Sequence, residues 1–207
     1  MGKHAQSIDQ AVLRRIRSKK RGAVFTPTDF LDLGGRAAVD QALSRNARAG
    51  TIRKLARGLY DLPRIDPAIG PLSPGAEDVA RALAKRDSAR IQPTGAHAAN
   101  LLGLTTQVPV KVVYLTDGGS RRVNLGRLQV VLRETTPRQM VTAGRISGTV
   151  IQALRWLGKR HVDDSTVAQL RRRLSPSDKR QLLADLRHAP GWVADVMRRV
   201  AQPNEER

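Results

Sequence analysis

The first 62 residues carry a succession of local patterns that limits how this chain can fold. Residues 7–17 predict a helix, with Ser7 as its N-cap and apolar residues repeating every four positions. Thr26 predicts the cap of a second helix, since Pro27 suits the first helical position, and this helix is expected to end near residue 33. A third helix is predicted over residues 36–49, stopped by a glycine. The stretch therefore indicates three helices in succession.

Two short runs typical of β-strands follow the third predicted helix. They cover residues 51–55 and 58–62, and Gly58 is the turn residue that a hairpin between them needs. Pro63 closes the unit. Helix, helix, helix and hairpin is the order of a winged helix-turn-helix, which we therefore predict for residues 1–65.

The rest of the chain predicts a different kind of unit. Residues 64–74, rich in proline and glycine, are expected to form a linker or strap. Strands and further helices are expected beyond it, and the turn Asp117-Gly118-Gly119 is expected to join two of the strands as a hairpin. The strands are predicted at 90–92, 110–115, 122–125 and 128–133, and the helices at 77–85, 95–102, 148–157, 164–173, 176–187 and 192–200. The predicted fold class is α+β, with the winged helix-turn-helix followed by an α/β domain with a helical C-terminus over residues 66–207.

Charge is the compositional feature that bears most on function. The chain has 37 Lys and Arg against 18 Asp and Glu, a net charge of +19. The densest excess, +9, lies in residues 1–65, and such an excess favours a polyanionic partner because binding releases counterions. No apolar run approaches the roughly 20 residues of a membrane-spanning helix, and the N-terminus has no signal-peptide core. With no cysteine, neither a disulfide framework nor a thiolate zinc site is expected. We expect a cytoplasmic protein with no membrane partner.

The predicted winged helix supplies candidate contacts to double-stranded operator DNA. The polar side of the third helix can reach base edges or phosphates in the major groove, and the hairpin tip can touch phosphate. The start of the second helix and the basic run before it can bind phosphate. The candidates are Lys19, Lys20, Arg21, Thr26, Thr28, Arg36, Gln41, Ser44, Arg45, Arg48, Arg53, Lys54 and Arg57.

Several of these stretches together resemble a known family. Residues 25–30, 39–45 and 50–60 resemble the AbiEi family, the antitoxins of type IV toxin–antitoxin systems, and residues 95–109 and 114–118 look similar as well. The run from Gly50 to Tyr60 is the most specific part. The resemblance implies a protein that represses its own operon through a winged helix. It also implies that the C-terminal region counteracts a cognate nucleotidyltransferase-like toxin encoded beside it.

Two alternatives remain beside the antitoxin interpretation. One is an ordinary transcription regulator with a ligand- or partner-sensing C-terminal domain, which a cavity lined by convergent polar groups would favour. The other is a nucleic-acid-processing enzyme, which would need a cluster of acidic residues or histidines, and Asp117 with Glu134 is the mid-chain pair that could contribute to one. A second basic cluster surrounds Arg171-Arg172-Arg173. Three interpretations of it remain: a solvated helix face, a further DNA contact, or a surface that docks on a toxin.

No cofactor, metal or catalytic activity is expected from this sequence. The four histidines are scattered without ligand spacing, at positions 4, 97, 161 and 188. His161 lies just before Asp163-Asp164, but Asp164 is expected to cap a helix there. Homodimerisation is left open.

Overall fold

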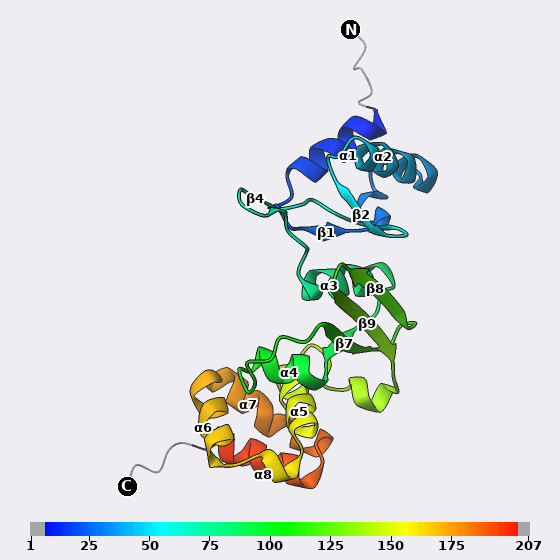
Figure 1. Ribbon diagram of the computed structural model, residues 1–207. Coiled ribbons are helices and arrows are strands. Elements are labelled where there is room, and N and C mark those ends of the chain that lie inside the picture. The colour runs from blue at the N-terminus through cyan, green and yellow to red at the C-terminus, as the bar shows by residue number, and fades with distance from the viewer. Residues whose placement is uncertain (1–6, 203–207) are drawn as a thin grey trace. The chain divides into compact units, whose positions relative to one another are not determined.

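The computed structural model of the chain describes residues 7–202 and mixes helices with several small sheets, which confirms the predicted α+β class (Figure 1). The chain divides into two compact units. The described part of unit 1 comprises residues 7–88 and 122–130, and that of unit 2 comprises residues 89–121 and 131–202. Unit 1 thus extends beyond residue 65, the predicted end of the first domain. His4 lies outside the described residues.

The first and third predicted helices of unit 1 are present. Helix α1 (Ile8–Arg17) is capped by Ser7, whose hydroxyl accepts the N–H of Gln10 at 3.3 Å. Helix α2 (Arg36–Arg48) ends where Gly50 takes a φ of +72°, a backbone conformation that favours glycine. Both helices lie together above the strands of the unit in Figure 1.

The second predicted helix is much shorter than expected. Only one 3-10 turn, η1 (Pro27–Phe30), forms in the stretch predicted as a helix to residue 33. The Asp29 carboxylate reaches back to accept the N–H of Thr26 at 2.8 Å, which closes a capping box around the turn. Gly35 then takes an extended conformation as the N-cap of α2, so the chain leaves helical geometry between the two elements.

A three-stranded antiparallel sheet completes this part of unit 1. Strands β1 (Val24–Phe25), β2 (Arg53–Ala56) and β3 (Leu59–Asp61) lie in the order β1-β3-β2. The β2–β3 hairpin turns at Arg57-Gly58, where Gly58 has a φ of +65°. The predicted hairpin is therefore confirmed.

One apolar core joins the helices to this sheet. It includes fully buried residues of α1, η1 and α2, and Tyr60 of β3 packs into the same cluster. The Phe25 and Phe30 rings meet edge to face at 5.5 Å between centroids. Tyr60 thus fixes the hairpin against the same core as α2. The fully buried members are Val12, Ile16, Phe25, Phe30, Val39, Ala42 and Leu43.

The stretch expected as a linker is partly ordered into a small hairpin. Strands β4 (Ile65–Asp66) and β5 (Gly70–Pro71) pair antiparallel, and the N–H of Leu72 donates to the carbonyl of Arg64 at 2.8 Å. Helix α3 (Ala76–Arg86) follows. Residues 64–74 therefore form a structured strap.

The four-stranded sheet has a different connectivity from the one predicted. Strands β6 (Ile91–Pro93), β7 (Lys111–Thr116), β8 (Arg121–Leu125) and β9 (Leu128–Glu134) lie in the order β6-β7-β9-β8. The predicted hairpin at Asp117-Gly118-Gly119 is wrong, because β7 and β8 are not neighbours. Instead, Asp117 holds Arg90, accepting its backbone N–H at 2.7 Å and its guanidinium at 2.8 Å.

Most of unit 2 is helical, and its helices share one apolar core. The longest ones are α5 (Ile146–Leu157) and α8 (Gly191–Ala201), whose buried residues pack in the same cluster. Asp163, rather than the expected Asp164, caps α6 by accepting the N–H of Thr166. The other helical elements are α4 (Gly95–Leu101), α6 (Asp164–Arg173), α7 (Pro176–Ala184), and the 3-10 turns η2 (Pro137–Met140), η3 (Lys159–His161) and η4 (Leu186–His188).

Candidate nucleic-acid interface

Helix α2 has two chemically opposite faces. Val39, Ala42 and Leu43 are fully buried against the core. Gln41, Ser44 and Arg48 follow one another at spacings of three and four residues, so they share one face of the helix, and this face is turned away from the buried side. Gln41 and Arg48 are exposed and Ser44 is partly exposed. This outward stripe combines the side chains that best read adenine, guanine and phosphate.

Arg36 and Arg45 flank the outward stripe, and each is held by a carboxylate. The Arg36 guanidinium lies 2.9 Å from Asp40 on the same helix, and that of Arg45 lies 3.0 Å from Asp9 on α1. All four side chains are at least one-third exposed, and such surface pairs contribute only about 0–1 kcal/mol. Both arginines can therefore exchange their carboxylate for a phosphate at little cost.

The hairpin separates a structural arginine from two free cations. Arg53 donates to both carboxylate oxygens of Asp61, at 3.0 and 2.6 Å, and to the carbonyl of Leu72 at 2.7 Å. The Asp61 side chain is only 1% exposed, so Arg53 neutralises a buried charge. Lys54 and Arg57 are exposed at and beside the turn. Of the three predicted hairpin contacts, these two are the ones whose side chains stand in solvent.

The start of η1 is less open to phosphate than the sequence suggested. Thr26 is 1% exposed, and its hydroxyl pairs with that of Thr28 at 2.7 Å. Lys19 extends over the Phe25 and Phe30 rings, 5.7 Å from each centroid. These side chains stabilise the turn and its core.

Asp29 places a negative charge at the same turn. Burial works to raise the pKa of its carboxyl, but hydrogen bonds from Lys85 and the Thr26 N–H, together with the charges of Lys85 and Lys19, hold that pKa below its ordinary value. Asp29 is therefore ionised at neutral pH, which opposes phosphate binding there.

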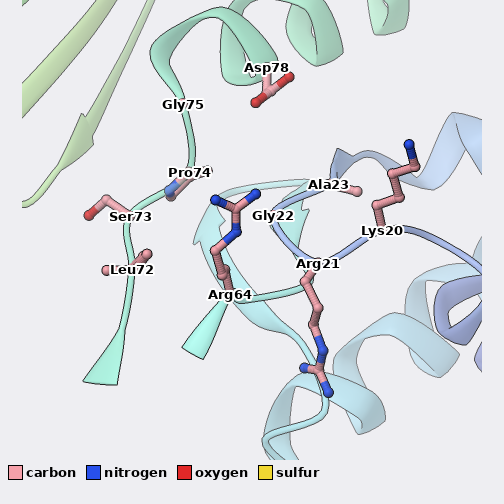
Figure 2. Close-up of a pocket in the computed structure, with 10 residues that line it drawn as sticks. All are labelled: Lys20, Arg21, Gly22, Ala23, Arg64, Leu72, Ser73, Pro74, Gly75 and Asp78. Carbon is pink, nitrogen blue, oxygen red and sulfur yellow. The ribbon is translucent and has the colours of Figure 1, made fainter. Parts of the chain in front are cut away.

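Lys20 and Arg21 lie at a shallow hollow of about 490 Å³ beside the strap (Figure 2). Arg64 extends toward Pro74 and Asp78 in Figure 2, whereas Arg21 extends the opposite way. Arg21 donates to the carbonyl of Pro63 at 3.3 Å. Since the hollow also includes a carboxylate, its charge is mixed, and Lys20 and Arg21 lie on a loop distinct from α2 and its hairpin.

A second hollow, also of about 490 Å³, lies in unit 2. Arg138 of η2, Arg155 of α5 and Arg187 of η4 line it, with His188 beside them. Sequence reasoning missed this site, because the arginines come from three elements and share no motif. Only the spacing of Ile151 and Arg155 on one face of α5 gives a local signal.

The described residues include neither a cluster for a metal ion nor a helix that could span a membrane. Within residues 7–202, no group of three or more His, Asp or Glu side chains is placed to hold a metal ion. Over the same range, no helix has both the length and the apolar character needed to cross a bilayer.

Comparison with known proteins places this mixed α+β chain in a family. A family model matches residues 11–182, and the chain belongs to that family, described as a family of unknown function (DUF6088). No curated protein matches the chain. Among solved structures, it is similar to the RV2827C protein from Mycobacterium tuberculosis, with 16% identity and a TM-score of 0.44 over 92% of this chain and 78% of that one.

Proposed function

We propose that the chain is a sequence-specific binder of double-stranded DNA that uses a winged helix-turn-helix in unit 1. The observation that carries this proposal is the outward stripe Gln41, Ser44 and Arg48 on α2, followed in the chain by a hairpin with exposed Lys54 and Arg57. A helix seated by one face can enter the major groove with the other. The order α1, η1, α2 and hairpin, with sheet order β1-β3-β2, supports the winged-helix assignment.

Within this proposal the outward stripe reads bases and the hairpin contacts phosphate. Gln and Arg form bidentate pairs with adenine and guanine, whereas Lys54 and Arg57 act as sequence-independent charges. Arg36 and Arg45 contact the backbone at the groove edges once they leave their carboxylates. Arg53 and Thr26 hold the scaffold and are not proposed as contacts.

The test is a gel-shift titration with the DNA upstream of the protein's own gene. Arg48→Ala and Gln41→Ala should weaken binding to that fragment more than to an unrelated duplex of equal length. Arg14→Ala, which removes the same charge from an exposed position of α1, is the matched control. If Arg48→Ala and Arg14→Ala weakened DNA binding equally, the loss of affinity would be a general effect of net charge, and base reading by α2 would be rejected.

The biological role that we propose is autorepression and antitoxin activity in the cytoplasm, without catalysis. It rests on the resemblance to AbiEi antitoxins of residues 25–30, 39–45, 50–60, 95–109 and 114–118. Co-expression with the gene beside it, expected to encode a nucleotidyltransferase-like toxin, tests this role by growth. The full chain should restore growth, and so should Arg48→Ala, because operator reading and neutralisation are then separate tasks. If neither restores growth, the antitoxin role is rejected and DNA binding remains.

An ordinary regulator whose second unit senses a ligand is the second candidate function. The hollow in unit 2 favours it, because polar and cationic groups from three elements converge there. Under this alternative the same DNA contacts hold, but a small molecule, rather than a toxin, controls them.

A further inference from the structure

The hollow in unit 2 has an unusual charge composition for its size. Three guanidinium groups line it, from Arg138, Arg155 and Arg187, and its lining includes no Asp or Glu. The first hollow, in contrast, contains Asp78 among its cations. A concave site with cations and no counter-charge attracts anions, because the low-dielectric walls concentrate the field.

These three arginines also differ from several other arginines of unit 2. Arg90, Arg145 and Arg199 of unit 2 each pair with an aspartate. Within residues 7–202, by contrast, no carboxylate lies within ion-pair distance of Arg138, Arg155 or Arg187. Arg187 instead donates to Nε2 of His188 at 3.3 Å. The hollow therefore keeps its positive charge.

The aspartate next to the hollow in sequence is already neutralised. Asp185 is 2% exposed and accepts hydrogen bonds from Arg145 at 2.8 Å, from Gln181 at 2.9 Å and from the Ser147 hydroxyl. With its oxygens used in this way, Asp185 is not available to Arg187. The network fixes the start of η4 without cancelling the charge of the hollow.

Uncharged polar groups complete the lining. Gln152 accepts the Thr94 hydroxyl on Oε1 at 2.9 Å, which leaves its NH2 group as a donor. Thr136 and Gln139 add further polar atoms, and the buried Ile151 supplies an apolar surface. A volume of about 490 Å³ falls within the roughly 300–1,000 Å³ typical of sites for small molecules.

We propose that this hollow binds a small phosphorylated metabolite bearing at least two phosphate charges, held by Arg138, Arg155 and Arg187. Guanidinium forks match phosphate oxygens in pairs, which favours phosphate over a single carboxylate. Three forks from separate elements suit a diphosphate group rather than one isolated phosphate. None of these three arginines is among the DNA contacts proposed for unit 1.

Calorimetric titration of the full chain tests the site with pyrophosphate and inorganic phosphate as probes. We expect one pyrophosphate per chain, bound at least tenfold more tightly than phosphate. Trp156 directly follows the lining residue Arg155, and Trp192 lies two residues after the lining residue Pro190. Tryptophan fluorescence therefore provides a second readout. Arg155→Ala should weaken pyrophosphate at least tenfold, and Arg155→Lys should restore only part of the affinity because the fork is lost.

Arg172→Ala is the matched control, since it removes an exposed arginine of α6 outside the hollow. The Arg172→Ala variant should bind pyrophosphate with the same affinity as the unmodified chain. If Arg155→Ala and Arg172→Ala lost the same pyrophosphate affinity, binding would depend on net charge alone and the proposal would be wrong. The absence of saturable binding would also overturn it. If Arg155→Ala instead lowered only affinity for duplex DNA, the hollow would be a DNA contact and the proposal would again be wrong. Failure of DNA binding in the gel-shift test leaves this result unaffected.

Discussion

The outward face of α2 and the hollow in unit 2 are both rich in arginine, but they use it differently. On α2, Arg36 and Arg45 are held by aspartates and frame a stripe in which Arg48 stands beside Gln41. In the hollow, three arginines converge with no carboxylate in the lining. A helix face that mixes amides with cations suits recognition of base edges, whereas a concave cluster of cations suits a compact anion.

This difference shows that net charge alone does not identify the partner. Both regions contribute to the chain's charge of +19. What distinguishes them is whether each cation is paired and whether the surface around it is a helix face or a hollow. Substitutions of paired and unpaired cations should therefore have different effects, and the following variants test that.

The largest effect is expected where an arginine neutralises a buried carboxylate. Arg53→Ala leaves Asp61 uncompensated inside unit 1, so we expect the free energy of unfolding to fall by about 3–5 kcal/mol. Urea denaturation of the full chain measures this. Arg57→Ala, four residues along the same hairpin, should change stability little. Equal stability of the two variants would contradict the structural role of Arg53.

Arg48→Ala should affect DNA rather than stability. Loss of one bidentate base contact weakens binding to the cognate fragment by about 1–3 kcal/mol, while the unfolding curve stays in place. Parallel gel-shift and urea measurements decide this. A shift in the unfolding midpoint as large as that of Arg53→Ala would mean that Arg48 belongs to the scaffold.

Asp185→Asn should lower stability in a manner that depends on pH. Burial works to raise the pKa of Asp185, but hydrogen bonds from Ser147 and Gln181, together with Arg145, hold it below the ordinary value of 3.8. Because the pKa of Asp185 is lower in the folded chain than in the unfolded chain, its ionised carboxylate stabilises the fold at pH values above the unfolded-state pKa. This stabilisation is lost as the pH falls through the folded-state pKa. We expect a loss of about 1–2 kcal/mol at pH 7 that shrinks below pH 4. A difference from the unmodified chain that stays constant down to pH 2 would contradict this account.

The smallest effect is expected from the two exposed hairpin cations. Replacing Lys54 and Arg57 by alanine should weaken cognate and unrelated DNA alike and flatten the dependence of affinity on salt. Each lost phosphate contact lowers the log–log slope by about 0.9. Titrations at several salt concentrations measure the slope. An unchanged slope with altered sequence preference would assign base reading to the hairpin.

Sequence patterns predicted the elements whose signals are local. The caps and apolar spacing of α1, the glycine after α2 and the Arg57-Gly58 turn all lie within a few residues of the element that they define. The short length of η1 was not predicted, because the residue pattern of a capping box is the same at the start of a long helix and at the start of a single turn. Strand order in the four-stranded sheet was missed, because β7 pairs with β9 rather than with the next strand in the chain, and such pairing leaves no local mark in the sequence.

The same limit applies to individual side chains. Arg53 was expected to contact DNA, because basic residues of a hairpin commonly do. Its actual partners, Asp61 and Leu72, lie 8 and 19 residues away in sequence, so no local pattern indicates them. The stripe on α2, by contrast, follows from helical spacing alone. The hollow in unit 2 required tertiary structure, because η2, α5 and η4 are separated in sequence and only folding brings Arg138, Arg155 and Arg187 to one place.

The hydrogen bond from Arg53 to the carbonyl of Leu72 sets a minimum length for any transplantable form of the N-terminal unit. A fragment cut at residue 65 would remove the strap that supplies this acceptor, together with the β4–β5 pairing. The arginine would then hold the Asp61 carboxylate without its third anchor, and the hairpin would lose its tie to the following chain. Fusion proteins that borrow this unit should therefore extend past the strap, whose length is part of the hairpin's support.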